Sequence, residues 1–463
     1  MDAFTHPDLW KRAREMAYGA LTCMGRHTLT GILTASGKQF TDWSAAYRLF
    51  SHQRIDIEKI FDVARENTLK ETGHLPMIIA HMDDTIIKKT GRHVPGASWR
   101  RDPLGPPFNT NFIWGQRFLQ ISMALPHDNG QCQSRAIPID FHHCPTAKKP
   151  SSGAEQAAWD QYKEVQKKIK LSKQGIDRIH LLREKLDQSD FRDKQLVLSV
   201  DGSYTNTQVL KGLPKKVTLI GRIRKDTKLF NLPDNQPHTG RKRVYGEQLP
   251  TPDQIRQSEQ YPWQEVKAWA AGKTHNFNVK VVNNIRWRSA GEKHDLMLVV
   301  IRPLGYRLTK LSKVLYRQPA YLICTDTKLD LQSLLQAYLW RWEIEVNFRE
   351  QKSLLGCGQA QVRKASSAEN VPAFIAAIYA LLHIANHRSA KVPNQKLLPR
   401  PKWYANKNNS RITTGDLINN LRAQLWAKAV GISFSGFVNL QTKTQNQRNT
   451  SNPLNCAQFY MRN

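Results

Sequence analysis

Apolar positions recur with helical spacing at the start of the chain and with strand spacing after it. Ile57, Ile60 and Phe61 follow the helical interval, and we predict a helical unit over residues 1–72. From Leu75 the pattern changes to apolar runs, MIIAHM, RFLQISMAL and SRAIPIDF, which are separated by Gly, Pro and Asn-Gly. Runs of this kind predict strands.

A charged helical pattern from Ala154 to Asp187, broken near Gly175, precedes the buried-type strand LVLSV. This order of strands, helix and strand predicts an α/β layer with a mixed sheet. Residues 213–330 then contain the further strand-like runs KVTLIGRIR, VKVVNNIRWRS, DLMLVVIRPL and AYLICTD. That segment is too long for a connection, so we predict a β-rich insertion that forms a domain of its own.

The segment Leu331 to Gly356 is predicted to be one long helix with a polar stripe between two apolar flanks. The stripe consists of Tyr338, Arg341, Glu345 and Lys352, which project from an arc of roughly 60° on a regular helix. A surface helix places its charged face opposite a single apolar face, so this pattern indicates residues that line a cleft. The alternative is a solvated face with ion pairs between successive turns.

Two more regions complete the pattern. The segment Asn370 to His387 predicts an apolar helix with Pro372 in its first turn. It belongs to residues 331–395, which we predict to form the second part of the core. The first part is residues 73–212. Residues 396–463 carry ten Lys and Arg with Asp416 as the one acid, which predicts a basic C-terminal region.

The charge balance narrows the class of partner. The 463 residues include 69 Lys and Arg against 38 Asp and Glu, for a formal net charge of +31, and such a field attracts polyanions, nucleic acid first. A membrane partner is not expected, because the most apolar run, Ala373 to Ile384, is shorter than a bilayer requires. The six cysteines form no CxxC pair, and the first ten residues lack the apolar stretch of a secretion signal. We expect a cytoplasmic protein with reduced thiols.

Three acids stand near the ends of apolar runs or in the polar stripe. Asp84 follows MIIAHM, Asp201 follows LVLSV, and Glu345 lies on the predicted helix. Adjacent strands can bring their ends together beneath such a helix, and converging carboxylates favour two Mg²⁺ ions that promote phosphodiester cleavage. Taken alone, each acid is better explained as a helix cap or a surface ion pair, so the prediction of a metal site rests on their convergence. Asp83 and Asp84 point to opposite faces of a strand, so only one of them can enter the cleft.

The spacing of Tyr338, Arg341, Glu345 and Lys352 resembles the helix signature of cut-and-paste bacterial insertion-sequence transposases of the DDE class. The Asp84-Thr85 pair also matches the first acid of that family, and LSVDG around Asp201 resembles the second. The resemblance implies a ribonuclease-H-like core interrupted by a β-rich insertion, with a helical DNA-binding N-terminus.

The resemblance also implies a role for each site residue. It implies that Asp84, Asp201 and Glu345 bind two Mg²⁺ or Mn²⁺ ions. It assigns DNA contacts to the remaining residues, which are Tyr338, Arg341, Lys352, Trp342 and Tyr321. Core packing is the alternative for Trp342 and for Tyr321, which stands where relatives that form a DNA hairpin carry Trp.

The implied activity is cleavage at terminal inverted repeats and joining of the 3′ ends to target DNA, with a homodimer on the two-ended substrate. The alternatives are a ribonuclease-H-like endonuclease without strand transfer and a catalytically silent DNA-binding repressor. No GxxxxGK[ST] loop is present in the sequence, so we expect no nucleotide cofactor.

Overall fold

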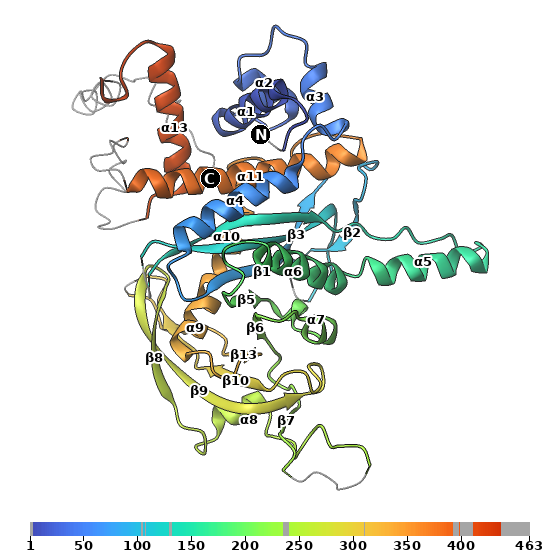
Figure 1. The fold of residues 1–463 in the computed structure, drawn as a ribbon, viewed down its shortest axis with the longest axis vertical. Coiled ribbons are helices and arrows are strands. Elements are labelled where there is room, and N and C mark those ends of the chain that lie inside the picture. The colour runs from blue at the N-terminus through green and yellow to red at the C-terminus, as the bar shows by residue number, and fades with distance from the viewer. Residues whose placement is uncertain are drawn as a thin grey trace.

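The computed structural model describes residues 3–102, 105–106, 108–128, 132–234, 240–309, 311–391, 398 and 411–436. A large mixed sheet runs through the molecule, with helices on both faces and a group of helices at one end (Figure 1). A mixed α/β architecture of this kind was predicted from the sequence.

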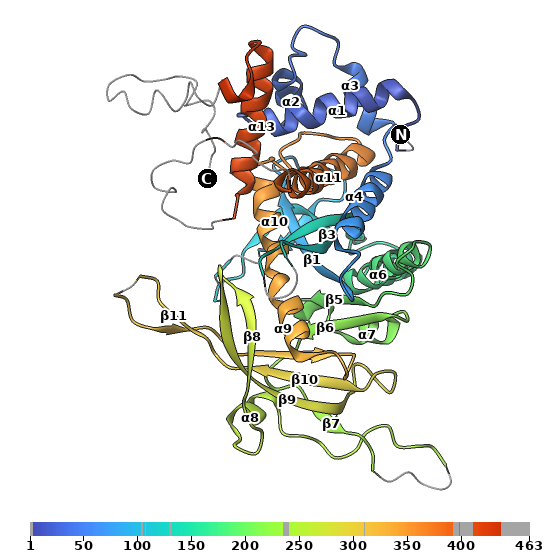
Figure 2. The same ribbon diagram turned by 60° about the vertical axis from the view of Figure 1, so that its left-hand side comes forward.

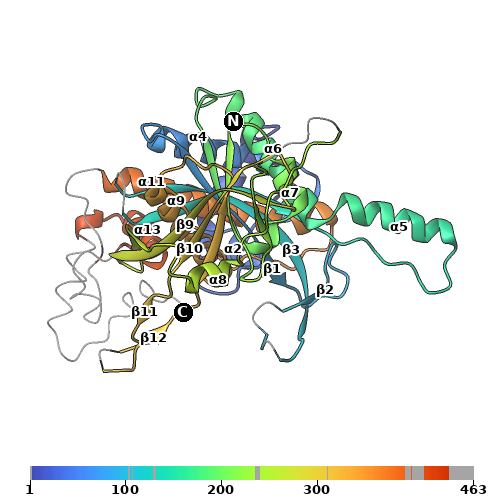
Figure 3. The same cartoon turned by 90° about the horizontal axis from the view of Figure 1, so that it is seen from below.

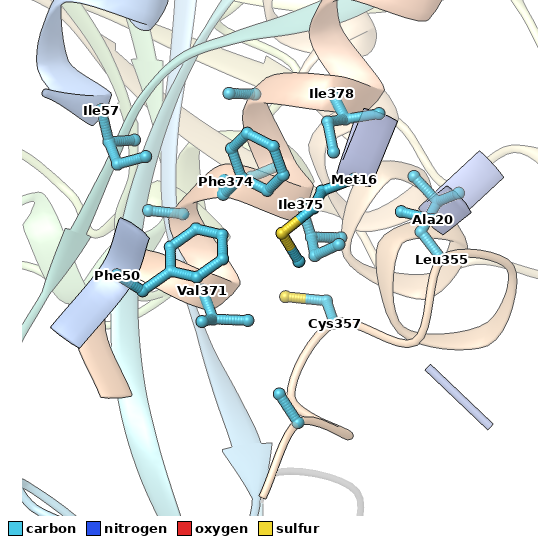
Figure 4. Close-up of a cluster of buried hydrophobic side chains, with 14 of the residues drawn as sticks. Met16, Ala20, Phe50, Ile57, Leu355, Cys357, Val371, Phe374, Ile375 and Ile378 are labelled. Carbon is cyan, nitrogen blue, oxygen red and sulfur yellow. The ribbon is translucent and has the colours of Figure 1, made fainter. Parts of the chain in front are cut away.

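The N-terminal unit is helical. Its helices are α1 (Pro7–Thr22), α2 (Leu29–Ala35), α3 (Ser44–Ser51) and α4 (Ile57–Thr72). They pack against α11 (Ala365–Ala390), where Phe50 meets Phe374 edge-on with ring centroids 5.3 Å apart (Figure 4). This shared core joins the N-terminal unit to the rest of the protein.

Five strands form the centre of the sheet. The order is β4–β3–β1–β5–β6, in which β1 is antiparallel to β3 and parallel to β5, and β5 is parallel to β6. Short β2 (Ser98–Arg101) pairs with β3. The bounds of the five are β4 Ser134–His143, β3 Phe112–Pro126, β1 Ile78–Lys88, β5 Leu196–Val200 and β6 Val217–Arg222.

The segment predicted to be a separate insertion domain extends this same sheet. Strand β13 (Ala320–Cys324) pairs with β6, and the order continues through β10, β9 and β7, with β8 beside β9. The small hairpin of β11 and β12 projects from this end (Figure 2). The bounds are β7 Leu229–Asn231, α8 Pro252–Gln257, β8 Gln264–Ala270, β9 Lys273–Trp287, β10 Leu296–Ile301, β11 Gly305–Tyr306 and β12 Leu315–Tyr316.

The charged helical segment before β5 forms two helices, α5 (Gln156–Lys168) and α6 (Leu171–Asp187). The break falls at Ile169 and Lys170 and not near Gly175, which lies inside α6 against Tyr204 and Met82. Helix α5 buries none of its residues and projects away from the sheet (Figures 1 and 3). Short α7 (Thr207–Gly212) follows β5.

The predicted long helix is two helices, α9 (Leu331–Trp340) and α10 (Trp342–Ser353), which meet at Arg341. Pro372 lies well inside α11 and not in its first turn. Although α11 is long and apolar enough to span a membrane, 72% of its most apolar window is buried in the protein, as for a core helix.

Helix α13 (Thr414–Ala429) belongs to the predicted basic C-terminal region. The rest of that region, including the Gln-, Asn- and Thr-rich stretch 441–455, lies largely outside the described residues. The five cysteines within the described residues are free thiols.

Candidate active site

Alternate side chains of β1 face two different layers of the protein. On one face, Asp83 pairs with Arg341 at the junction of α9 and α10, and Thr85 accepts a hydrogen bond from Lys352 of α10. On the other face, Met82 packs in the cluster that contains Tyr204 and α6. The strand therefore presents Asp83, and not Asp84, to the helices that carry Glu345.

The register of the central strands places Asp83 next to Asp201. The parallel ladder of β1 and β5 pairs Ile78 with Leu196 and continues residue by residue to Met82 with Val200. One step further along both chains, the same offset aligns Asp83 with Asp201. Asp201 directly follows β5, whereas Asp83 lies within β1, which continues to Lys88. The register nevertheless sets the two acids side by side on adjacent parallel strands.

Arg341 lies among the three carboxylates. Its Nη1 is 3.2 Å from Asp83 Oδ2, and its Nη2 is 3.5 Å from Glu345 Oε1. Burial lowers the pKa of Arg341, but Tyr338 and the charges of Asp83, Asp201 and Glu345 more than offset it and raise the pKa overall. The guanidinium is therefore the positive charge that balances this acidic cluster.

The carboxylates repel one another. Burial, together with the charges of Asp84 and Asp201, raises the pKa of Asp83 to about 7 against the opposing effect of Arg341. Burial also raises the pKa of Glu345, and Asp201 adds to that rise. Since Asp201 acts on both of the other acids, the three carboxylates lie within electrostatic range of one another.

Asp84 lies on the opposite face, which corrects the interpretation that it is the acid in the cleft. Its Oδ1 accepts a hydrogen bond of 2.8 Å from the Tyr204 hydroxyl, and its Oδ2 lies 3.3 Å from Arg117 Nε. Tyr204 is fully buried. These contacts direct the Asp84 side chain away from Asp201 and Glu345.

The break between α9 and α10 follows from a change in hydrogen-bond partners. In a continuous helix the Arg341 N–H would bond to the Ala337 carbonyl, but it donates to Tyr338 O at 3.1 Å. The Ala337 carbonyl accepts a hydrogen bond of 3.1 Å from the buried Ser199 hydroxyl of β5. Ser199 thereby fixes the end of α9 against the strand that leads to Asp201.

Replacing Ser199 with alanine is expected to lower the free energy of unfolding by about 1–2 kcal/mol, because a buried carbonyl loses a partner. Denaturant unfolding measures the change. Ser203, an exposed serine on the turn just beyond Asp201, provides the matched control, and its replacement with alanine should leave stability nearly unchanged. An equal loss in the two variants would contradict the role of Ser199.

Two further residues of the predicted stripe, and the neighbouring Trp342, lie around the cluster. The Lys352 Nζ donates to Thr85 Oγ1 at 2.6 Å, and burial lowers the pKa of Lys352. The Arg341 guanidinium lies 5.8 Å from the Tyr338 ring centroid. Trp342 is 60% exposed, which excludes the alternative of core packing. The structure thus gathers the stripe on one side of the sheet.

Tyr321 does not belong to an accessible surface. Its side chain lies on β13 in the core, 4% exposed, and its hydroxyl donates to Asp253 Oδ1 at 2.5 Å. Burial raises the pKa of Tyr321 to about 12, and the Asp253 bond raises it as well. Tyr321 therefore packs in the core, and the DNA contact predicted for it is wrong.

The donor chemistry of the cluster suits a hard divalent cation, because Mg²⁺ prefers carboxylate oxygens. A cation bound there would also relieve the mutual repulsion of the three acids. Within the described parts of the chain, however, no three acidic, His or Cys side chains already lie close enough to hold a metal. Arg341 takes that electrostatic role in this conformation.

Sequence reasoning did not identify three residues of this site, namely Asp83 as the cleft-facing acid, Ser199 and His81. His81 is fully buried on the Asp83 face of β1, and burial, together with Arg341, lowers its pKa to about 3, so its ring is neutral. Asp83 directly follows its apolar run, as Asp201 directly follows LVLSV, and this was a signal for Asp83. No signal in the sequence marks the Ser199 contact.

Comparison with known protein families adds one match. A family model described as a DDE superfamily endonuclease matches residues 1–292. That range includes Asp83, Asp84 and Asp201 and ends before α9 and α10. A search of curated proteins finds no match.

Proposed function

Because the chain belongs to the DDE superfamily of endonucleases, we propose that it is a transposase that binds transposon terminal inverted repeats, cleaves there and joins the 3′ ends to target DNA. Membership of this family indicates a transposase-like endonuclease that acts on DNA. The observation that carries the finer proposal is the common location of Asp83, Asp201, Glu345 and Arg341 beside the exposed Trp342.

The three carboxylates of Asp83, Asp201 and Glu345 would hold two Mg²⁺ or Mn²⁺ ions. The ions would supply an activated water and stabilise the leaving oxygen of a phosphodiester. Asp83 replaces Asp84 in this proposal, since only Asp83 shares a face with the other two acids.

The basic and aromatic side chains of the stripe would position the DNA. Arg341 presents a planar guanidinium that suits two phosphate oxygens, whereas Lys352 supplies a point charge. Tyr338 has a hydroxyl with no hydrogen-bond partner among the described residues, which leaves it available to a phosphate. With a net charge of +31, the protein would hold the strongly anionic DNA over the site. We further propose that a homodimer engages the two transposon ends in the cytoplasm.

Replacing Trp342 with alanine is expected to weaken DNA binding by roughly tenfold, because stacking of one base on an aromatic ring contributes about 1–3 kcal/mol. Fluorescence anisotropy with labelled DNA measures the effect without metal. Unfolding should be unchanged, since the ring is exposed. Trp340 is the buried counterpart, because it is 5% exposed and donates a hydrogen bond to the Cys132 carbonyl oxygen. Its replacement with alanine should lower the free energy of unfolding. Unchanged DNA affinity of the Trp342 variant would contradict the role of its ring.

The test of the whole proposal uses purified protein, Mg²⁺, target plasmid and linear DNA that carries the inverted repeats flanking the gene. Joined products that contain transposon ends within the plasmid are expected. Cleavage without joining would replace the proposal with a ribonuclease-H-like endonuclease. Repeat binding without any metal-dependent cleavage would replace it with a repressor. A hairpin on the released end would show how the second strand is cut.

A further inference from the structure

A cavity of about 510 Å³ lies on the side of β1 opposite to the acidic cluster. Its floor includes Arg117 of β3, the residue that pairs with Asp84, and Cys144, which follows β4. Its walls come from both helices that precede β5, with Tyr162 on α5 and Gln174 on α6. None of the side chains assigned to DNA cleavage lines this cavity.

Arg100 provides a buried positive charge at the cavity. Its side chain is 8% exposed, one amino group donates to the Cys144 carbonyl oxygen at 3.0 Å, and its Nε is buried without a hydrogen-bond partner among the described residues. Burial, together with the charge of Arg117, lowers the pKa of Arg100 to about 10. Two guanidinium groups are thus close together, with Asp84 as the acid paired to one of them.

The N-terminus of α6 adds positive potential to the same cavity. Helix α6 has 17 residues, its N-cap is Lys170, no side chain caps its first turn, and that turn contains no acid. Lys170 and Leu171 both line the cavity. Free N–H groups and the helix dipole favour an anion at such an end.

We propose that this cavity is a phosphate-binding site, filled by a DNA backbone phosphate or by a free phosphorylated molecule. Two guanidinium groups match the oxygens of a phosphate, and a buried cation with an unpaired Nε is stabilised when an anion approaches it. The cavity is large enough for a phosphate and part of the group attached to it. Projecting α5 forms one wall, so a DNA strand that follows this helix would pass the opening.

The site can be tested without metal, so the result does not depend on cleavage or strand transfer. Inorganic phosphate is titrated in EDTA at constant ionic strength, and the thermal midpoint of unfolding is recorded. The midpoint of the wild type should rise and saturate, because a ligand that binds the folded state stabilises it. Lys170→Glu should abolish the rise. This exposed substitution places an acid at a helix N-terminus, which favours folding, whereas Arg117→Gln also removes the partner of Asp84.

Lys163→Glu is the matched control, because Lys163 lies exposed on α5 and outside the cavity lining. It should keep the full response to phosphate. An identical response to phosphate in the wild type, Lys170→Glu and Lys163→Glu would overturn the proposal. So would the absence of any response in the wild type together with equal DNA binding by the two variants.

DNA binding in EDTA distinguishes the two sources of phosphate. If the occupant is a DNA phosphate, Lys170→Glu should reduce the slope of log affinity against log salt by about 1 relative to Lys163→Glu, the change expected for one lost phosphate contact. If the occupant is a free phosphorylated molecule, the two variants should bind DNA equally while only Lys170→Glu loses the stabilisation by phosphate.

Discussion

Asparagine in place of Asp83 is expected to reduce metal-dependent DNA cleavage by roughly 10³-fold or more. The amide keeps the size of the side chain but removes the charge that a divalent ion needs, and stabilisation by such ions is worth several kcal/mol, with each 1.4 kcal/mol corresponding to about tenfold in rate. Cleavage of end-labelled DNA at saturating Mg²⁺ provides the measurement. Asp201→Asn and Glu345→Gln should show losses of similar size.

Asp84→Asn is the matched control, since it makes the same chemical change one residue away on the other face of β1. It should keep cleavage within about tenfold of the wild type and lose some stability, because a hydrogen bond to a charged group contributes about 1.5–3 kcal/mol. All four variants should still bind DNA in EDTA. An inactive Asp84→Asn beside an active Asp83→Asn would show that the acid in the cleft is Asp84.

The choice between these two acids shows where sequence reasoning stopped. The apolar runs correctly predicted strands at β1 and β5, although β1 continues past both acids to Lys88, and the resemblance of Asp84-Thr85 to a family motif favoured Asp84. The face that each acid occupies is instead set by distant contacts, in particular Met82 and Tyr204 packing beside Gly175 of α6. Strand alternation requires the two acids to separate, but it does not say which layer lies on which side.

The break at Arg341 and the position of the insertion depended on nonlocal contacts as well. Arg341 itself has helical backbone angles, φ −54° and ψ −32°. The helical spacing of the sequence therefore continues through this residue and does not indicate a break. What changes is the partner of the Ala337 carbonyl, which comes from Ser199 far away in sequence. Likewise, the strands of residues 213–330 were predicted from their apolar runs. The pairing of β13 with β6, which makes these strands part of the core sheet, was not predicted.

Glutamine in place of Arg341 is expected to change cleavage and metal affinity in opposite directions. Cleavage should fall by roughly 10²-fold, the usual cost of losing one group that stabilises charge in the transition state. Affinity for Mn²⁺ should rise by about tenfold or more, because the guanidinium lies 3.2 Å from Asp83 and 3.5 Å from Glu345 and competes with any other cation for these acids. Electron paramagnetic resonance of free Mn²⁺ measures the affinity.

Arg341→Lys separates the charge of this residue from its shape. Lysine retains the positive charge, so Mn²⁺ affinity should remain near that of the wild type, yet it lacks the planar guanidinium that binds two phosphate oxygens, so cleavage should still fall. If Arg341→Gln instead binds Mn²⁺ more weakly than the wild type, the guanidinium organises the carboxylates for the metal and does not compete with it. In the expected case, Arg341 neutralises three mutually repelling acids until metal and DNA together take over, the metal binding the acids and the phosphate binding the arginine.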